Sequence, residues 1–270
     1  AWDVHLEGTE IAVDNVHIPI PAPSPQELFT LITESVTPET KVLFLSHITS
    51  STAVRLPAEQ LCAWARDRGI FTIVDGAHVP GQLPLDLSTL KADVYTGNLH
   101  KWMCTPKGSA FLWVRPEVQK YFTPPIVSWG NWMVSAMDSD LVTEHEYSGT
   151  RDPSPFLTVP KAIELMKEWD WEGVLARGRE MRNNTMRRLL ALDGVGPISD
   201  WESDELLLGP VTLPQGIDVM KVKERLYEEF GIEVVVLLVN EQPLLRFSVH
   251  AHTRQEDLDR LVEALPKVIS

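Results

Sequence analysis

Lys101 stands in the stretch GNLHKW, directly after a histidine and between two apolar segments. Lysine is almost never fully buried without a partner, so either its ammonium group reaches the surface or the amine has a chemical use. An amine held in an apolar, electropositive pocket loses its proton more easily and can form a Schiff base with a carbonyl compound. One lysine does not decide between the two readings, because a surface lysine is the commoner case.

Asp75 ends the apolar run FTIV, and His78 follows in DGAHVPGQ. Ligands of parallel sheets bind outside the carboxyl ends of the strands, where Asp75 is expected. A pyridoxal phosphate site needs a carboxylate there to keep the pyridine nitrogen protonated. A turn at Asp75-Gly76 and a loop histidine without a role explain these residues equally well. Lys101 comes one strand-to-strand crossover later, so neighbouring strands could aim Asp75 and Lys101 at one ring.

The elements that must position these residues alternate between strand and helix. Strands are expected at 10–18, 41–46, 71–75, 93–97 and 109–114, with helices at 24–35 and 56–69. This order predicts an α/β fold with a mainly parallel sheet covered by helices on both faces. Residues 122–140 are rich in Pro, Gly and Ser and are expected to form a long, functional loop.

The remaining sequence predicts a different architecture. Helices are expected at 155–170, 174–192, 218–231 and 255–265, and strands at 205–213, 232–239 and 244–250. We therefore expect a large domain over residues 1–158 and a smaller α+β domain over residues 159–270. His250 and His252 would share one strand face, but no further ligand is evident, so no metal site is expected.

Composition excludes several classes of function. The 270 residues carry a net charge of −14, which opposes binding to nucleic acid. No apolar run approaches the length of a transmembrane helix, so no membrane partner is expected. The two cysteines, Cys62 and Cys104, are expected as reduced thiols of a cytoplasmic protein. The chain begins at Ala1 without an initiator methionine, so we do not expect this end to indicate the localisation.

The segment VDGAHVPGQLPLDLSTLKADVYTGNLHKWMCTPKGSAFL resembles the core of the class V aminotransferases, a superfamily of pyridoxal-phosphate enzymes. The pattern is Asp-x-x-His, a spacer ending in Asp-x-x-x-Gly-Asn-x-His-Lys, then Pro-Lys-Gly and an apolar strand. Within the superfamily, the isopenicillin N epimerase-like group is most similar. The resemblance continues through SHITSSTAVRLP, SWGNW, YSGTRDPSPFLTVPKAI and LLRFSVHAHTRQEDLDRLVEAL.

The resemblance implies roles around the cofactor. Lys101 would form the Schiff base with pyridoxal 5'-phosphate and move the Cα proton, and Asp75 would pair with the pyridinium nitrogen. His78 would approach the phenolic oxygen. His100 and Asn98 would hold the phosphate, because polar groups fix an anion.

Further roles fall outside this core. Ser50 lies where relatives carry a polar cofactor contact, often Asn. Gly149-Thr150 matches a pair that reaches the partner's phosphate in the superfamily, which implies a homodimer with shared sites; a plain helix-capping segment is the other reading. Arg246, inside an apolar strand, would bind the substrate's α-carboxylate, and a structural ion pair is its alternative.

The chain departs from the superfamily in two features. Cysteine desulfurases need a nucleophilic cysteine upstream of the carboxylate-binding arginine, and residues 231–247 contain none. Persulfide formation is therefore not expected. Relatives also carry an N-terminal portion with a phosphate-binding turn and an aromatic residue stacked on the ring, and we expect this chain to lack it.

The expected function is proton abstraction at Cα of an amino-acid-type substrate. Epimerisation, transamination and β-elimination with C–S cleavage use the same residues, so the sequence does not choose among them. The alternative is a truncated, non-catalytic relative that serves as a binding or dimerisation module. Retention of Lys101 and Asp75, neither of which has an evident structural need, argues against that alternative.

Overall fold

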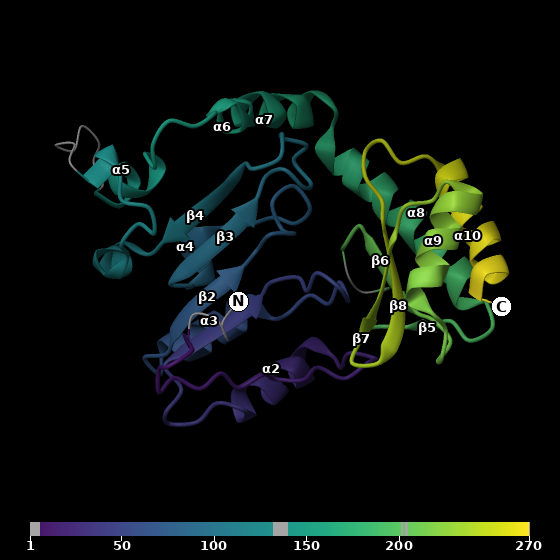
Figure 1. Ribbon diagram of the computed structural model, residues 1–270, viewed down its shortest axis with the longest axis horizontal. Helices are drawn as coiled ribbons and strands as arrows, with labels where there is room; N and C mark the ends of the chain where they lie inside the picture. Colours follow the sequence, from purple (N-terminus) through teal and green to yellow (C-terminus); the bar gives the residue numbers. More distant parts are fainter. Residues whose placement is uncertain (1–5, 132–139, 201, 203–204, 270) are drawn as a thin grey trace.

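The computed structural model describes residues 6–131, 140–200, 202 and 205–269. Two four-stranded sheets lie side by side, each with its own helices, and helices α6 (Ser154–Leu157) and α7 (Val159–Glu168) connect them (Figure 1). We call residues 6–157 the N-terminal part and residues 158–269 the C-terminal part. The expected domain boundary at residue 158 coincides with the start of α7 and stays a prediction.

The sheet of the N-terminal part has the order β1-β2-β3-β4. Strands β1 (Val42–Ser46), β2 (Phe71–Asp75) and β3 (Val94–Asn98) are parallel, and β4 (Ala110–Val114) is antiparallel to β3. Short apolar runs separated by helices produce this arrangement, because a parallel connection needs a crossover of helical length. The expected α/β fold with a mainly parallel sheet is confirmed.

Helices cover one face of this sheet. The helices α2 (Pro25–Glu34), α3 (Ala58–Arg66) and α4 (Leu87–Leu90) share a buried core with alternate residues of β1, β2 and β3. Helix α2 begins with a capping box in which Ser24 and Glu27 bind each other's backbone amides, and Pro25 stands at its first position. Local capping and core packing therefore agree on where this helix starts.

The other face of the sheet is more open. Val42 and Phe44 on β1 and Leu112 on β4 are each 47–49% exposed. These residues alternate with the buried ones, because successive side chains of a strand point to opposite faces. The contacts of the described residues do not show the expected helical cover of this second face.

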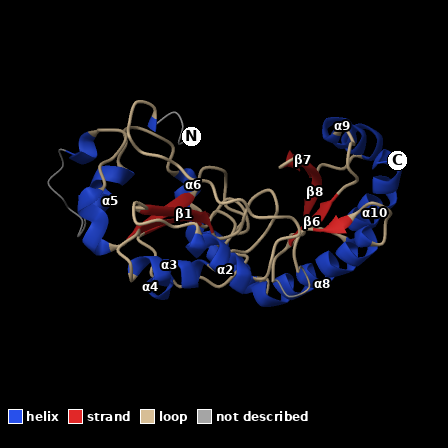
Figure 2. Cartoon of the chain, turned by 90° about the horizontal axis from the view of Figure 1, so that it is seen from below, coloured by secondary structure: helices blue, strands red, loops and turns tan. Residues whose placement is uncertain are grey.

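The C-terminal part holds the second sheet, of order β5-β6-β8-β7, in which all neighbours are antiparallel. Its strands are β5 (Gly196–Pro197), β6 (Leu208–Thr212), β7 (Val235–Val239) and β8 (Gln242–Ser248). Helices α8 (Trp171–Leu190), α9 (Val219–Phe230) and α10 (Gln255–Ile269) share its core (Figure 2). The helices and strands predicted for this region are therefore present.

Two segments differ from expectation. The predicted strand at 10–18 is wrong: the segment has no regular secondary structure, and Val16 and Ile18 pack on the core of the N-terminal part without a partner strand. The expected loop at 122–140 contains a short 3-10 helix, η2 (Trp129–Asn131), after η1 (Pro116–Tyr121), and residues 132–139 lie outside the described residues. Helix α5 (Asp140–Glu146) follows.

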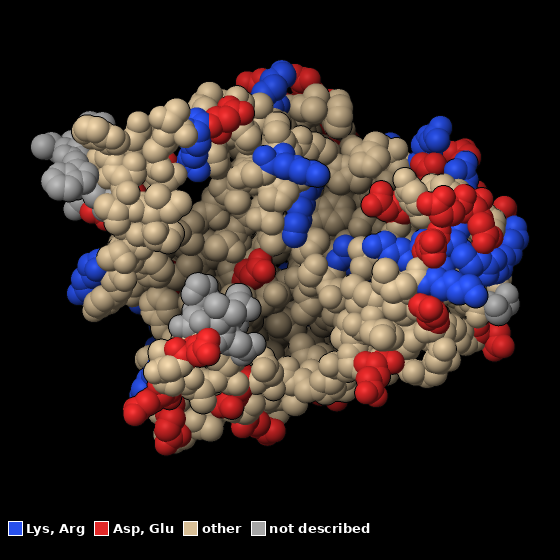
Figure 3. All heavy atoms as spheres, viewed as in Figure 1, with Lys and Arg blue, Asp and Glu red and all other residues tan. Residues whose placement is uncertain are grey.

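Within the described ranges, no helix combines the length and apolar character that crossing a bilayer requires. The face shown in Figure 3 is hollowed between the two parts, and acidic and basic side chains are spread over the rims. The hollow is where side chains from both sheets can meet.

Candidate active site

Parallel pairing brings the ends of β2 and β3 to one edge of the sheet. Asp75 is the last residue of β2 and pairs with Thr96 on β3, so Asn98 and the turn that carries Lys101 leave the sheet beside it. Asp75 Oδ1 accepts a hydrogen bond from the Ala77 amide at 2.9 Å. This bond is the one expected of a turn at Asp75-Gly76, and the second carboxylate oxygen makes no hydrogen bond to the residues that the structure describes.

Lys101 and His78 are in direct contact. Lys101 Nζ lies 3.3 Å from His78 Nε2, and His78 is buried. Burial, followed by the charges of Lys101 and Arg246, lowers the pKa of His78 to about 4. Burial also lowers the pKa of Lys101; the Asp75 charge opposes this effect and the Arg246 charge adds to it. His78 is therefore neutral near pH 7 and accepts a hydrogen bond from the amine.

Arg246 enters from the other sheet. On β8, Leu245 and Phe247 belong to the core of the C-terminal part, whereas Leu244 packs against the core of the N-terminal part. Because strand side chains alternate, Arg246 points to the same side as Leu244. Its Nη1 donates a hydrogen bond to the carbonyl oxygen of Ser50, and burial lowers the pKa of Arg246.

Ser50 is thus brought to Arg246, although the contact uses its backbone rather than its hydroxyl group. His100 is held elsewhere: its Nδ1 lies 2.8 Å from the Ser109 carbonyl oxygen, in the loop before β4. Because a carbonyl oxygen only accepts, His100 Nδ1 carries a proton in this contact. Asn98 ends β3 opposite Ala110.

Gly149 and Thr150 lie in the segment between α5 and α6, and Gly149 has a φ of 109°. No described contact joins either residue to Lys101, His78 or Asp75. Within one chain the structure therefore does not bring this pair to the site.

Two residues that the sequence did not single out lie next to the site. His47 follows β1 directly; its amide donates to the Asp75 carbonyl oxygen at 2.8 Å, and its Nδ1 lies 3.1 Å from Tyr95 Oη. Burial lowers the pKa of His47. Gln82, fully buried, donates from Nε2 to the His78 carbonyl oxygen at 2.8 Å. The signal for His47 was its place after an apolar run, the same feature that pointed to Asp75.

The two thiols are not prepared for nucleophilic chemistry. Burial raises the pKa of Cys62 to about 12 and also raises the pKa of Cys104. The thiolate is the reactive form, so neither group offers a nucleophile near pH 7. Among the described residues, no group of three or more His, Cys, Asp or Glu side chains could hold a metal ion.

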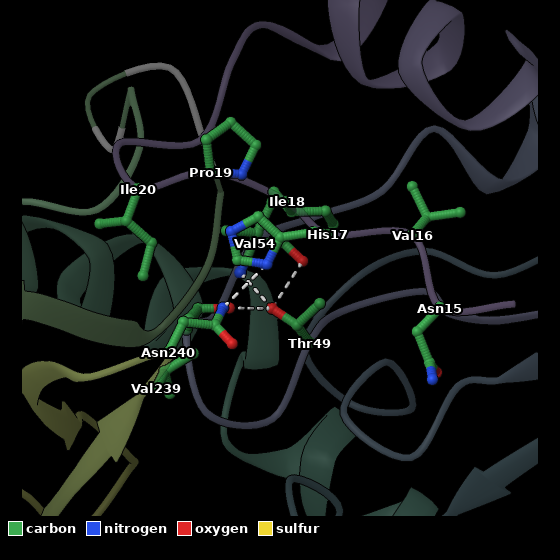
Figure 4. A pocket seen from close by; sticks show the side chains of 11 residues that line it. Asn15, Val16, His17, Ile18, Pro19, Ile20, Thr49, Val54, Val239 and Asn240 are labelled. Atoms are coloured by element: carbon green, nitrogen blue, oxygen red, sulfur yellow. Dashed lines mark hydrogen bonds between the residues drawn. The ribbon is translucent and has the colours of Figure 1, made fainter. Parts of the chain in front are cut away.

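A cavity of about 300 Å³ lies at the loop after β1, and the residues that line it do not include Asp75, His78, Lys101 or Arg246 (Figure 4). It is bounded by the segment before α2, the loop after β1 and the β7–β8 turn. His17 and Asn240 both line it and contact each other, with His17 Nδ1 3.2 Å from Asn240 Nδ2. Thr49, the neighbour of Ser50, also lines it. The cavity thus reaches the loop that Arg246 contacts.

The donor set at the sheet edge fits pyridoxal phosphate. An amine with a lowered pKa and a carboxylate stand at the ends of adjacent strands, as an aldehyde and a pyridinium nitrogen require. His78 Nδ1 and Arg246 Nε are buried and have no hydrogen-bond partner among the described residues. Buried polar atoms are normally satisfied, so these two atoms are available to a bound molecule.

Comparison with known proteins points the same way. The aminotransferase class-V family model matches residues 14–261. The chain is 35% identical to isopenicillin N epimerase of Amycolatopsis lactamdurans, over 99% of this chain and 70% of that protein. It is 38% identical to the enzyme of the same name from Streptomyces clavuligerus, over 89% of this chain and 63% of that protein. A putative L-cysteine desulfhydrase of Oryza sativa is 28% identical, over 85% of this chain and 52% of that protein.

Solved structures show the same fold at low sequence identity. The cystine C-S lyase C-DES, in complex with cysteine persulfide, matches with a TM-score of 0.82 and 20% identity, over 99% of this chain and 71% of that chain. A C-DES variant with glycine covalently linked to its pyridoxal-phosphate cofactor matches with a TM-score of 0.74 and 21% identity, over 89% of this chain and 64% of that chain.

The chain spans about two thirds of the length of the two epimerases that it matches. The family model covers most of the chain, including β2, β3 and the turn that carries Lys101. The chain therefore belongs to the aminotransferase class-V family of pyridoxal-phosphate enzymes.

Proposed function

We propose that this protein moves a proton at Cα of an amino-acid substrate, with Lys101 as the covalent anchor of pyridoxal 5'-phosphate. The observation that carries the proposal is the contact of 3.3 Å between Lys101 Nζ and His78 Nε2. The charges of Asp75 and Arg246 both act on that amine. An amine so placed is a nucleophile for an aldehyde when bound and a base when free.

When bound, pyridoxal phosphate supplies an aldehyde for the substrate amine and a ring that accepts electron density from Cα. Asp75 holds a proton at the ring nitrogen by offering it a carboxylate. His78, neutral near pH 7, packs beside the anchor and keeps Lys101 oriented without adding a positive charge. Lys101 Nζ, as a free amine, would take the proton from the substrate's Cα.

Arg246 binds the substrate's α-carboxylate through its guanidinium group. Its contact with the Ser50 carbonyl oxygen orients it while Nε stays available. A carboxylate fixed from the C-terminal part and an amine fixed near Lys101 leave Cα between them. This two-point hold determines which bond of Cα faces Lys101.

We propose that the reaction is epimerisation, in which Cα is protonated again after Lys101 has removed its proton. Identity to the two isopenicillin N epimerases, 35% and 38%, exceeds the 28% to the putative L-cysteine desulfhydrase of rice. The high pKa of Cys62 and Cys104 gives no support to persulfide chemistry. The non-catalytic alternative lacks support. Partial burial of the Lys101 and His78 side chains costs free energy, and among the described residues their only side-chain hydrogen bond is the one between them.

We further propose a homodimer in the cytoplasm in which Gly149-Thr150 of each copy contributes to the partner's phosphate site. No described contact joins the pair to Lys101 in its own chain, which a shared site explains. Measuring the molar mass in solution tests the dimer. Labelling efficiency at Lys101 in Thr150→Ala tests the contribution of the pair.

The central test is covalent capture. The purified chain is incubated with pyridoxal phosphate, reduced with borohydride and digested, and the tagged peptide is identified by mass spectrometry. We expect the tag on Lys101 in the unsubstituted chain and in Lys107→Ala, which removes the nearest other lysine. Lys101→Ala is expected to remain folded and untagged. A tag on Lys107, or uptake that is unchanged in Lys101→Ala, contradicts the proposal.

A further inference from the structure

Gln82 has no exposed surface, and both ends of its amide are bound to backbone. Nε2 donates to the His78 carbonyl oxygen at 2.8 Å, and Oε1 accepts from the Leu207 amide at 2.6 Å. His78 belongs to the N-terminal part and Leu207 to the C-terminal part. One side chain thus joins the residue that contacts Lys101 to the other half of the molecule.

The connection continues to Arg246. Leu207 precedes β6, and its carbonyl oxygen accepts a hydrogen bond from the Val249 amide at 2.9 Å. Val249 directly follows β8, the strand that carries Arg246. Arg246 in turn donates to the Ser50 carbonyl oxygen. A continuous series of hydrogen bonds therefore runs from His78 through Gln82 to the strand of Arg246.

The backbone around Gln82 is held in place as well. Gly81 has a φ of 84°, and a Cβ atom there would lie 2.8 Å from the Trp102 carbonyl carbon. Both facts require glycine. The Gly81 carbonyl oxygen accepts a hydrogen bond from Trp171 Nε1 at 2.7 Å, and His250 stacks on Trp102 at 5.5 Å between ring centroids. These contacts also join the two parts, but they do not bind His78.

We propose that Gln82 is a positioning residue that sets the separation between His78 and Arg246, and thereby the charge environment of the Lys101 amine. The inference rests on the proposed function only in that His78, Lys101 and Arg246 form the site. Gln82 itself touches neither cofactor nor substrate. It acts through the His78 carbonyl oxygen on one side and the Leu207 amide on the other.

The pKa of the Lys101 amine depends on the position of the C-terminal part. Within the described part of the chain, His78, Asp75 and Arg246 are the titratable or charged groups that act on Lys101 or contact it. Burial and Arg246 lower the pKa of Lys101, and Asp75 opposes them. If the C-terminal part moves away from His78, Lys101 becomes more exposed to water and lies farther from the Arg246 charge. The pKa of Lys101 then rises, and less free amine is present at a given pH.

The experiment measures the reactivity of Lys101 in the chain without added cofactor. The probe is acetic anhydride, applied from pH 7 to 10, with acetylation of Lys101 and of Lys107 quantified by mass spectrometry in the same sample. We expect Gln82→Leu to lower acetylation of Lys101 relative to Lys107 by up to about tenfold at pH 8, because a rise of one pKa unit reduces the free fraction of a mostly protonated amine about tenfold.

Two control variants separate positioning from general loosening. Gln119→Leu removes a side-chain hydrogen bond of the same kind, from Nε2 to the Val114 carbonyl oxygen at 3.0 Å, away from the site. Trp171→Phe removes the bond to Gly81 between the two parts and leaves Gln82 intact. We expect an unchanged Lys101 profile in both. An equal shift in Trp171→Phe, or no shift in a folded Gln82→Leu, overturns the proposal.

Gln82→Asn provides for the case in which Gln82→Leu does not fold. Asparagine keeps a neutral amide but is one methylene too short to reach both partners, so the same direction of shift is expected. Loss of folding in both variants would make Gln82 a stability element and refute the narrower role. The unsubstituted chain treated with pyridoxal phosphate and borohydride separates the two claims. A Lys101 profile that depends on Gln82 without cofactor uptake would reject the proposed function and retain the positioning role.

Discussion

The two ends of strands β2 and β3 carry buried polar clusters that differ in how their charges and polar atoms are paired. At the amino end, Asp93 precedes β3 and is 4% exposed. Its carboxylate accepts hydrogen bonds from the Thr72 amide at 2.8 Å and from the Arg115 side chain at 2.7 and 2.8 Å. Its amide donates to Thr72 Oγ1 at 2.9 Å. The charge is paired and the lone pairs are used, as a stabilising network requires.

At the carboxyl end of the strands, basic groups outnumber acidic ones. Lys101, His78 and Arg246 are basic groups, and among the described residues Asp75 is the acidic group that acts on Lys101. His78 Nδ1 and Arg246 Nε have no partner among the described residues. The difference indicates that one edge of the sheet serves stability and the other is kept ready for an anionic ligand, at a cost to the unliganded fold.

The largest expected effect is at the amino end. We expect Asp93→Ala to lower the free energy of unfolding by about 3–5 kcal/mol, because removing one partner of a buried ion pair leaves the other uncompensated. Urea unfolding followed by circular dichroism measures it. Glu117 contacts the same Arg115 at 3.1 Å but is 68% exposed, so Glu117→Ala should change stability by less than about 0.5 kcal/mol. Equal effects of the two variants would end the distinction between the clusters.

The next effect is on chemistry rather than stability. We expect Asp75→Asn to retain the cofactor but to slow exchange of the Cα proton about 100-fold, since the uncharged amide no longer holds a proton at the ring nitrogen. Exchange of L-alanine in deuterium oxide, followed by NMR, is the measurement. Asp86→Asn changes an exposed helix cap and should leave the rate unaltered. An unaltered rate in Asp75→Asn would remove this carboxylate from its role.

The sequence predicted the residues at the carboxyl edge of the first sheet better than it predicted the contacts between the N-terminal and C-terminal parts. Asp75 and Lys101 follow apolar runs, and the rule that ligands bind at the carboxyl ends of parallel strands was enough to place them together. The 10–18 segment misled because alternating apolar residues predict a strand only where a partner strand exists. Gln82 carried no local signal: its role comes from Leu207, far along the chain, and no periodicity contains that contact.

Arg246 shows the intermediate case. An arginine inside an apolar strand signalled a buried charge that needed a partner. The sequence could not tell which core its face would meet, since β8 contributes Leu245 to one core and Leu244 to the other. Only the pairing of the two sheets makes Ser50 its neighbour.

A smaller effect concerns pH. Burial and two nearby cations lower the pKa of His78 to about 4, whereas an unfolded histidine titrates near 6.5. Between these values the unfolded chain binds the extra proton, so stability falls as the pH falls. We expect His78 to contribute a loss of about 2 kcal/mol between pH 7 and pH 5. His78→Gln should reduce that loss, and His17→Gln, at an exposed site, should not. Matching pH profiles in the two variants would contradict the buried, neutral state of His78.

The smallest effect tests the cost of the carboxyl end directly. Lys101→Met removes a half-buried cation that lies beside Arg246 and keeps a flexible side chain of similar length. If that edge is reserved for a ligand, the variant should unfold with a free energy higher by about 0.5 kcal/mol, a modest gain because water still screens the amine. Lys107→Met, at an exposed position, should leave stability within error, and both variants are compared by urea unfolding without cofactor. A destabilisation of more than about 1 kcal/mol in Lys101→Met would show that the lysine is bound into the fold as Asp93 is, and the contrast between the two ends of the sheet would then fail.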